Sequence, residues 1–209
     1  MLRAMKKILL ALILCLAPLG ALHAAEASIS AKDRNDLDRI ETYLNELKTI
    51  SADFLQIDDA GGMMRGEIAI SRPGKMRVTY LTNNDFIVAD GHFVHIWDDS
   101  LQNQTSVEQE SSLAEFILRD PIKLHGEVTV TKYKRFPSKI EITLVQTSDP
   151  AAGSLTLVLE DHPLKLRQWK VVDAEGHSTG VNLENMTEGM TFPDSTFVFV
   201  PPTFSKNPS

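Results

Sequence analysis

The chain has 209 residues with 21 basic and 28 acidic side chains, a formal net charge of −7, and 43% of its residues are hydrophobic. This hydrophobic content allows a sizeable core. The net negative charge argues against binding to nucleic acid and against simple electrostatic attachment to anionic lipid. Beyond the first 27 residues the length fits one domain, which we expect to span residues 28–209.

The N-terminus has the pattern of a secretory signal peptide. Basic residues at positions 3, 6 and 7 precede an apolar run at residues 8–16, and small residues then offer cleavage after Ala24 or Ala27. The run is too short for a transmembrane helix, and no second apolar stretch of about 18 residues follows. Because residues 1–27 carry three basic side chains and one acidic one, the predicted mature protein is exported, soluble and has a net charge of −9.

The single cysteine, Cys15, lies inside the apolar run. Leu14 precedes it, where a lipid-attachment site needs a small residue, so we interpret Cys15 as part of the removed signal. The mature chain then holds no cysteine, which excludes disulfides and thiolate chemistry. Its stability must come from a hydrophobic core.

A capping-box pattern, Ser-Ala-Lys-Asp at residues 30–33, predicts that a helix begins there. Leu37, Ile40, Leu44 and Leu47 then recur at helical spacing up to about residue 50. The mature protein therefore opens with one amphipathic helix.

From residue 52 onward the hydrophobic period changes to two, as expected for half-buried strands. Turn signals such as Arg72-Pro73-Gly74 and Asp90-Gly91 separate the segments, which together predict an antiparallel meander of about ten strands. The residues that share a face within each segment are Ile68 and Ile70; Met76, Val78 and Tyr80; Phe93, His95 and Trp97; Val128 and Val130; Ile140, Ile142 and Leu144; Leu155, Leu157 and Leu159; Trp169 and Val171; Thr179, Val181 and Leu183; and Phe197 and Phe199.

Residues 111–118 interrupt this rhythm. A serine cap, an early glutamate, and Leu113, Phe116 and Ile117 at helical spacing predict a short amphipathic helix between two groups of strands. Two helices cannot cover so many strands as a second full layer. We therefore expect a mainly β fold with capping helices (α+β), in which one strongly curved antiparallel sheet is capped on its concave face over an apolar space.

Patterns for catalysis and metal binding are weak. Residues 176–180 match the G-x-S-x-G pattern of a hydrolase, but that motif needs a helix after the serine, and Ser178 instead enters an alternating strand. No histidine follows Ser178, and we interpret the segment as a hairpin. The six histidines are scattered without metal-ligand spacing, and no phosphate-binding glycine loop is present. These observations favour a binding protein over an enzyme, with no cofactor and no metal.

Arg72 is the charged residue that the pattern singles out, because it ends the segment at residues 67–71 and Pro73 holds it in an extended conformation. It is either a solvated turn arginine or an arginine at the mouth of a cavity, where its planar set of donors can bind carbonyl groups of a lid. The residues alone leave both interpretations open.

Seven segments in a specific order carry a resemblance to a known family. They are ADFLQ (52–56), GEIAISRPGKMRVTY (66–80), IVADG (87–91), residues 97–104, GSLTL (153–157), PLKLRQW (163–169) and FVFVPP (197–202). Through them the chain resembles the periplasmic lipoprotein carrier family LolA along essentially its whole mature length. The resemblance implies a half-open β-barrel closed by a helical lid, whose apolar cavity receives the acyl chains of lipoproteins.

The resemblance also implies roles for individual residues. Arg72 becomes a latch that locks the lid by hydrogen bonds, which loading has to break. The family usually has a bulky apolar residue at the position of Met76 and often a tryptophan at that of Val78, so the chain departs from the pattern at both. The flexible thioether of Met76 still suits varied acyl chains. The implied lid residues are Leu37, Ile40, Leu44, Leu47, Leu113, Phe116 and Ile117, and the implied cavity lining is Phe54, Ile68, Ile70, Met76, Val78, Tyr80, Phe93, Trp97 and Trp169.

The partners implied by the resemblance are acylated lipoproteins, an inner-membrane ABC transporter that loads the carrier, and an outer-membrane acceptor that unloads it. We expect a periplasmic monomer. Three alternatives stay open: a carrier of free lipid or glycolipid, an envelope lipid or lipoprotein sensor of the same fold, and, most distantly, a hydrolase based on Ser178. Sensors of this kind usually carry an additional domain, for which the chain, ending at Ser209, leaves no room.

Overall fold

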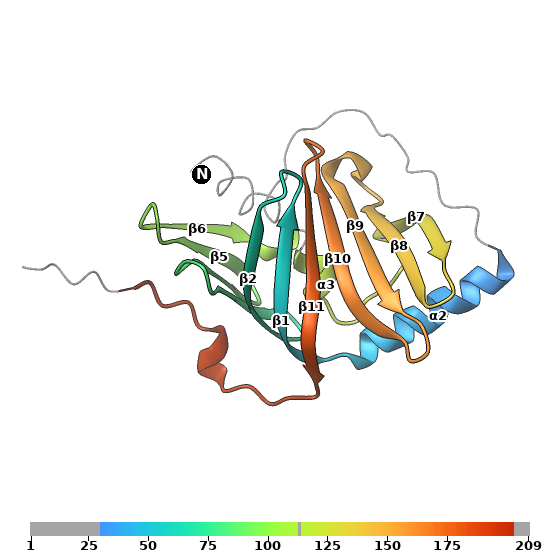
Figure 1. Ribbon diagram of the computed structural model, residues 1–209, viewed down its shortest axis with the longest axis horizontal. Coiled ribbons are helices and arrows are strands. Elements are labelled where there is room, and N and C mark those ends of the chain that lie inside the picture. The colour runs from blue at the N-terminus through green and yellow to red at the C-terminus, as the bar shows by residue number, and fades with distance from the viewer. Residues whose placement is uncertain (1–29, 113, 203–209) are drawn as a thin grey trace, which may run out of the picture.

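The computed structural model describes residues 30–112 and 114–202. Eleven strands form one antiparallel sheet in the order β6-β5-β4-β3-β2-β1-β11-β10-β9-β8-β7 (Figure 1). The strands are β1 (Thr49–Asp58), β2 (Met63–Ser71), β3 (Lys75–Tyr80), β4 (Phe86–Asp90), β5 (Phe93–Asp98), β6 (Asn103–Glu108), β7 (Val128–Arg135), β8 (Lys139–Gln146), β9 (Gly153–Glu160), β10 (Lys165–Asp173) and β11 (Ser178–Glu188). β6 and β7 form the two free edges, so the predicted curved, half-open sheet is confirmed.

The opening helix, α2 (Ala31–Glu46), begins as predicted. The Ser30 hydroxyl accepts a hydrogen bond from the Asp33 N–H, and the Asp33 carboxylate accepts one from the Ser30 N–H, which completes the capping box. The helix ends earlier than the predicted residue 50. Leu47 already has the backbone of a C-cap, and Ile50 belongs to β1, whose pairing with β2 and β11 overrides the continuing helical spacing.

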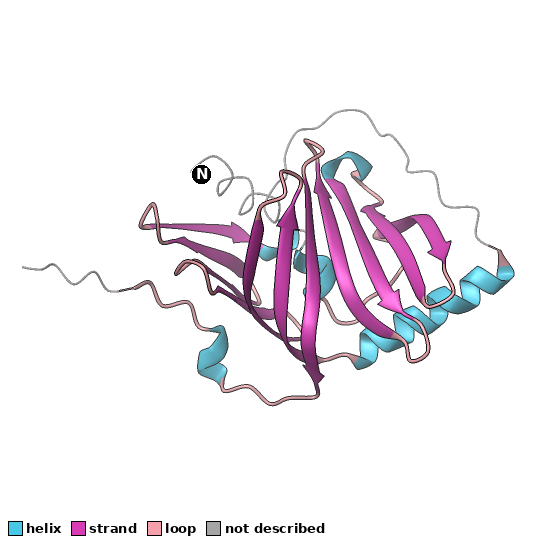
Figure 2. Cartoon of the chain, viewed as in Figure 1, coloured by secondary structure: helices cyan, strands magenta, loops and turns pink. Residues whose placement is uncertain are grey.

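The second helical element lies between the two free edges of the sheet. A 3-10 helix, η1 (Gln109–Ser111), follows β6 directly, and α3 (Ala114–Leu118) comes next in the chain. Figure 2 shows α2 and α3 behind the strands of the sheet in this view. The remaining helical turns are η2 (Pro150–Ala152) and η3 (Asp194–Phe197).

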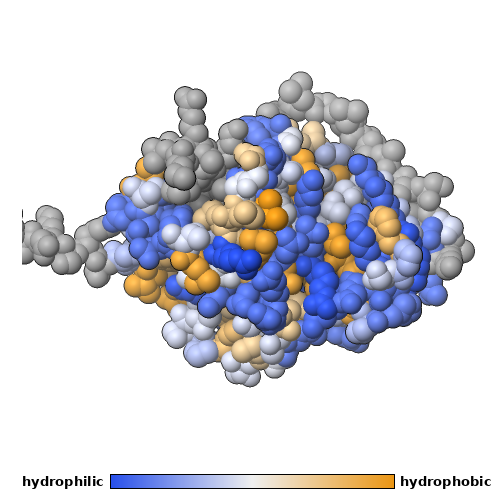
Figure 3. Space-filling view, in the orientation of Figure 1, coloured by the Kyte–Doolittle hydropathy of each residue, from blue (hydrophilic) through white to orange (hydrophobic). Residues whose placement is uncertain are grey.

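The concave face of the sheet and the helices share one hydrophobic core. Residues of α2 and α3, such as Ile40 and Leu118, belong to the same buried cluster as inward-facing residues of ten strands, all except β6. Burial of this surface, at about 25 cal/mol per Å², is the main stabilising contribution available to a chain without disulfides. The outer face of the sheet, seen in Figure 3, is mostly hydrophilic with separate apolar patches.

The observed strands differ from the prediction at the C-terminus and at β6. The alternation at Phe197 and Phe199 does not form a strand: Phe197 ends η3, and the chain then runs without sheet pairing across the outer face of β3 and β4. Conversely, β6 was not predicted, because its six residues are mostly exposed and polar and give no hydrophobic alternation. The predicted signal peptide lies outside the described residues. Within the described ranges, no helix is long and apolar enough to span a membrane.

Candidate functional site

An apolar cavity lies between the concave face of the sheet and α3. Six of the residues expected to line a cavity come together there, and they are Phe54, Ile68, Met76, Val78, Tyr80 and Trp169. Ala114 and Ile117 of α3 close it from the other side. Because successive side chains of a strand point to opposite faces, these six side chains all point to the concave face, and each is at most 8% exposed.

A second, smaller apolar space continues the first toward α2. It shares Ile117 and Trp169 with the main cavity, and it also contains Ile70, another expected lining residue. Leu44 and Leu47 of α2 and Phe116 of α3 form its helical side. The expected lid residues of both helices thus lie over one continuous apolar interior, Ile40 is fully buried in the same core, and the half-buried Leu37 packs at its margin. Leu113 lies outside the described residues.

The cavity is nearly closed. The two apolar spaces have volumes of about 50 and 20 Å³. By this measure one water molecule needs about 10–15 Å³, so the interior has room for a few water molecules and none for a long acyl chain. A larger, open hollow of about 820 Å³ near the end of β8 has a mixed lining, with charged residues such as Glu115 and Glu127 beside apolar ones such as Phe116 and Leu155. The enclosed apolar interior could hold a long chain only if α2 and α3 moved away from the sheet.

Two of the expected lining residues, Phe93 and Trp97, face the other way. Phe93 is 44% exposed, and Trp97 packs with Phe86 on the outer face of the sheet, beneath Phe199 of the C-terminal segment. The inward residues of β5 are Val94 and Ile96. The expectation was wrong because β5 is apolar on both faces, so its pattern gives the period but not which face meets the core.

Arg72 lies at the α2 end of the interior, in the space that contains Leu44, Leu47 and Ile117. Its side chain is half-buried, and burial lowers the pKa of its guanidinium, although Asp120 and Tyr43 partly oppose this effect. The Nε atom is buried, and no described residue accepts a hydrogen bond from it. Among the described residues, Arg72 Nε therefore contributes no hydrogen bond to a latch, and the role of the Arg72 side chain stays a prediction.

The backbone of the same turn contacts both helical elements instead. The Arg72 N–H donates a hydrogen bond to the Lys48 carbonyl, just after α2, at 2.9 Å. The Gly74 N–H donates one to the carbonyl of Leu118, the last residue of α3, also at 2.9 Å. Gly74 has φ of 78°, and a side chain there would place its Cβ 2.8 Å from the Cα of Gly91. The turn between β2 and β3 thus holds the lid mainly by main-chain bonds.

The segment from α3 to β7 is fastened along α2, so that the lid forms one connected body. The Asn45 side chain donates to the Ile122 carbonyl and accepts from the Ile122 N–H, both at 2.8 Å. The Glu41 carboxylate accepts from the Leu124 N–H at 2.8 Å, and Lys48 pairs with Asp120 at 2.7 Å. Opening α2 is therefore expected to carry residues 120–124 with it.

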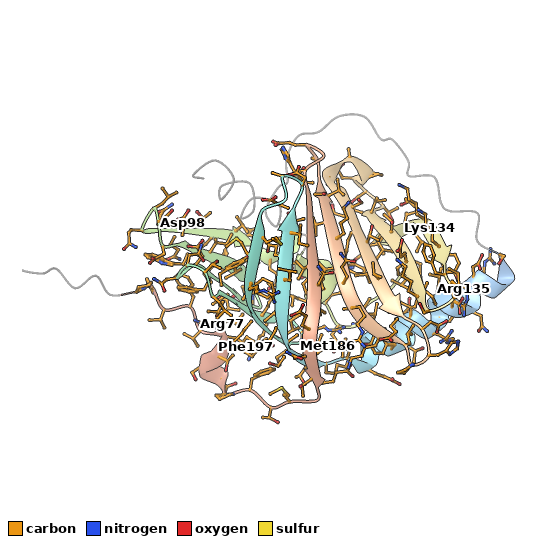
Figure 4. The ribbon with its side chains drawn as sticks, in the orientation of Figure 1. Arg77, Asp98, Lys134, Arg135, Met186 and Phe197 are labelled. Atoms are coloured by element: carbon orange, nitrogen blue, oxygen red, sulfur yellow. The ribbon has the colours of Figure 1, made fainter. Side chains whose placement is uncertain are left out.

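The N-terminal half of α2 is held by a network of two carboxylates and two guanidinium groups. Arg39 bridges Asp36 and Asp161 at 2.8 and 2.9 Å, and Arg135 of β7 bridges the same two carboxylates. The Tyr133 hydroxyl donates to Asp36 at 2.6 Å. Arg135 lies at the end of β7 beside α2 (Figure 4). This network, which sequence reasoning missed, connects the lid to β7 and to the turn between β9 and β10.

The network lowers the pKa of both carboxyls. Burial raises the pKa of Asp36, but hydrogen bonds from Tyr133, Arg135 and Arg39 together outweigh it. At Asp161 burial is likewise outweighed by the hydrogen bond from Arg39 together with the charges of the neighbouring basic side chains. Burial and the hydrogen bond to Asp36 raise the pKa of Tyr133 to about 12. At neutral pH both carboxylates are therefore ionised, and their pairs with Arg39 and Arg135 connect α2 to β7 and to the turn between β9 and β10.

Acidification is expected to loosen the N-terminal half of α2. A carboxyl with a lowered folded pKa stabilises the fold above its unfolded pKa, about 3.9 for aspartate, and loses this contribution as the pH falls through the folded value. Hydrogen-exchange protection factors in residues 33–40 should thus be constant down to about pH 5 and fall below about pH 4. Asp33 at the helix start and the exposed His162, 3.4 Å from Asp161, are the other titratable groups beside this network.

The matched variant is Asp36→Asn, which removes one of these carboxyls. It should lower the protection factors already at neutral pH, because Arg135 and Arg39 lose a charged acceptor, and show a smaller further loss on acidification. Wild-type protection that stays constant from pH 6 to about pH 3 would contradict the assignment.

Inside the apolar cavity lies one polar pair that sequence reasoning also missed. The Tyr80 hydroxyl donates to Gln56 Oε1 at 3.0 Å, and burial raises the pKa of Tyr80. Gln56 is 6% exposed, and its Nε2 atom has no hydrogen-bond partner among the described residues. The alternation of Ala52, Phe54 and Gln56 along β1 is the signal that would have found it.

The motif around Ser178 is a hairpin, as predicted. Ser178 begins β11, so a strand and not a helix follows the turn. Although the histidines were not expected to lie at metal-ligand spacing, this turn brings Asp173, Glu175 and His177 together, with potential ligand atoms within 4.8 Å of one another. Asp173 Oδ1 accepts hydrogen bonds from the N–H groups of Glu175 and His177, which accounts for its position in the turn.

Comparisons with known proteins agree with this geometry. The model of the family described as outer membrane lipoprotein carrier protein LolA matches residues 45–200. An outer-membrane lipoprotein carrier protein of Pseudomonas putida (strain W619) is 26% identical over 191 residues, which cover 87% of this chain and 89% of that protein. An uncharacterised protein, RP864, of Rickettsia prowazekii (strain Madrid E) is 21% identical over 207 residues, covering 98% and 92%. The crystal structure of a DUF1329 family protein from Desulfovibrio piger is similar in fold, with a TM-score of 0.50 at 7% identity over 82% of this chain and 98% of that one.

Proposed function

Because the chain belongs to the LolA family of outer membrane lipoprotein carrier proteins, we propose that it is a periplasmic carrier that encloses the acyl chains of lipoproteins released from the inner membrane. The observation that carries the proposal is the apolar interior beneath a lid, in which residues of α2 and α3 face the concave side of the sheet. Residues 1–27 would direct export and be removed.

The closed interior fits a carrier that must also release its cargo. Each buried methylene contributes about 0.8 kcal/mol, so complete burial of several long acyl chains would give tens of kcal/mol, more than a reversible carrier can give up. Opening has a cost that offsets this gain, because the helices must leave an interior with only about 50 Å³ of free space and break the contacts that hold them. Net affinity can then be moderate.

The proposed carrier needs one partner that loads it and another that receives its cargo. An inner-membrane ABC transporter would load the carrier as a monomer, and an outer-membrane acceptor would receive the lipoprotein. The acidic surface suits a protein that crosses the periplasm without adhering to anionic bilayers, since like charge disfavours such contact.

The test uses the mature protein, residues 28–209, and a synthetic triacylated lipopeptide. Native mass spectrometry should detect a one-to-one complex with the lipopeptide and none with the same peptide lacking its acyl chains. Mass spectrometry of material that co-purifies from the periplasm then identifies the natural ligand. Free phospholipid or glycolipid alone would favour a lipid carrier, and absence of any acylated ligand in both measurements would reject the proposal.

A further inference from the structure

Gln56 is a polar group in a cavity that otherwise suits hydrocarbon. It lies on the inward face of β1, two residues from Phe54, and borders the main apolar cavity together with Val78, Tyr80 and Val181. A buried amide donor without a partner costs about 1–3 kcal/mol, so native proteins rarely keep one. Such an atom in a ligand cavity indicates a group on the ligand that completes it.

The hydrogen-bond geometry defines the kind of group. The Tyr80 hydroxyl donates to Gln56 Oε1, which fixes the amide and leaves its Nε2 donors without a partner among the described residues, in a side chain that borders the cavity. Burial raises the pKa of Tyr80, so the hydroxyl keeps its proton and its role as donor. The missing partner is therefore an acceptor, and it must sit next to an apolar chain to fit the surrounding side chains.

We infer that Gln56 binds a carbonyl oxygen of the cargo, the ester or amide carbonyl through which an acyl chain is attached. This inference rests on the proposed function, and it adds a polar contact that fixes the position of the cargo along the cavity. The acyl chains would then extend from Gln56 past Ile117 and Trp169 toward the space beneath Leu44 of α2, because those two residues border both parts of the interior. Gln56 would thus distinguish an acylated ligand from a plain hydrocarbon of equal length.

A pair of probes separates the polar contact from hydrocarbon burial. One is a diacylglyceryl lipopeptide with two ester-linked chains, and the other is its dialkyl ether analogue, which lacks the ester carbonyls. We expect the mature wild-type protein to bind the ester about two- to tenfold more tightly than the ether, the range of one net hydrogen bond. Gln56→Met, which keeps the side-chain length, should bind both probes equally and bind the ether at least as well as the wild type.

Two further variants control the result. Gln104→Leu changes an exposed glutamine on the edge strand β6 and should keep the wild-type preference. If Gln56→Met is unstable because the Tyr80 hydroxyl loses its acceptor, the double variant with Tyr80→Phe removes both partners and should give the same loss of preference. Equal binding of both probes by the wild type, or an unchanged preference in the Gln56 variants, overturns the inference while leaving the carrier function intact. Failure of the wild type to bind either probe rejects the proposed function, and the inference with it.

Discussion

Asp161→Ala is expected to lower the melting temperature of the mature protein by about 5–10 °C. Asp161 is 5% exposed and accepts hydrogen bonds from both Arg39 and Arg135, so its removal leaves two guanidinium groups short of a carboxylate. Loss of one partner from a fully buried pair costs about 3–5 kcal/mol; here about 2–3 kcal/mol is expected, because both arginine side chains keep about a third of their surface in water. A domain of this size loses about 2–4 °C per kcal/mol.

The loss should be concentrated in the lid. Calorimetry measures the melting temperature, and hydrogen exchange should show reduced protection in residues 33–40 more than in the central strands β1 and β11. The control is Glu127→Ala, which removes a 2.5 Å pair with Arg119 in which Glu127 is 82% exposed, and which should change stability by less than about 1 kcal/mol. If Asp161→Ala were no more destabilising than Glu127→Ala, the network would not hold the lid.

The elements of the fold follow from local patterns in the sequence. The capping box at Ser30 marks the start of α2 because both of its hydrogen bonds are made within four residues. Period-two alternation likewise predicts most strands, since it depends only on neighbours along the chain. Two strands have no counterpart among the predicted alternating segments. β4 is buried on both faces and shows no alternation, and β6 is a free edge whose polar residues face solvent, where no core selects apolar side chains.

The orientation of a strand and its distant partners are harder to predict. In β5 both Val94 and Trp97 are buried, one against the concave core and the other beneath the C-terminal segment, so sequence alternation cannot tell the faces apart. Asp36 and Arg39 are recognisable as neighbours on a helix, but Arg135 and Asp161 follow about a hundred residues later. Their meeting depends on the curvature of the whole sheet.

In the candidate site, too, the position of a residue in a local motif can be predicted, but its distant contacts cannot. Arg72 borders the apolar space between the helices and the sheet, and it could be singled out from the sequence because the Arg-Pro-Gly turn is a local motif. The hydrogen bonds of this turn could not be predicted in the same way. The main-chain N–H groups of Arg72 and Gly74 donate to Lys48 and Leu118, whereas no described residue accepts a hydrogen bond from Arg72 Nε. The role of the side chain therefore has to be argued from its surroundings.

Arg72→Leu is expected to load normally and to release its cargo about ten- to a hundredfold more slowly. The guanidinium borders an apolar space that acyl chains would enter, and a leucine there would add about 1.5–3 kcal/mol of apolar burial to the loaded state. Each 1.4 kcal/mol corresponds to a factor of ten, so the added burial accounts for the slower release. The measurement is transfer of an acylated lipoprotein from the mature carrier to acceptor-bearing membranes.

The stability of the empty protein distinguishes this explanation from a side-chain latch. If Arg72 locked the closed lid by hydrogen bonds, Arg72→Leu would lower the melting temperature. In the conformation described here the half-buried guanidinium is desolvated and lacks a partner at Nε, so its removal should raise the melting temperature by about 2–6 °C. Arg72→Lys, which keeps the charge, should retain release close to the wild-type rate. Normal transfer by Arg72→Leu would reject a role for this side chain in release, whereas slow transfer together with a lowered melting temperature would restore the latch.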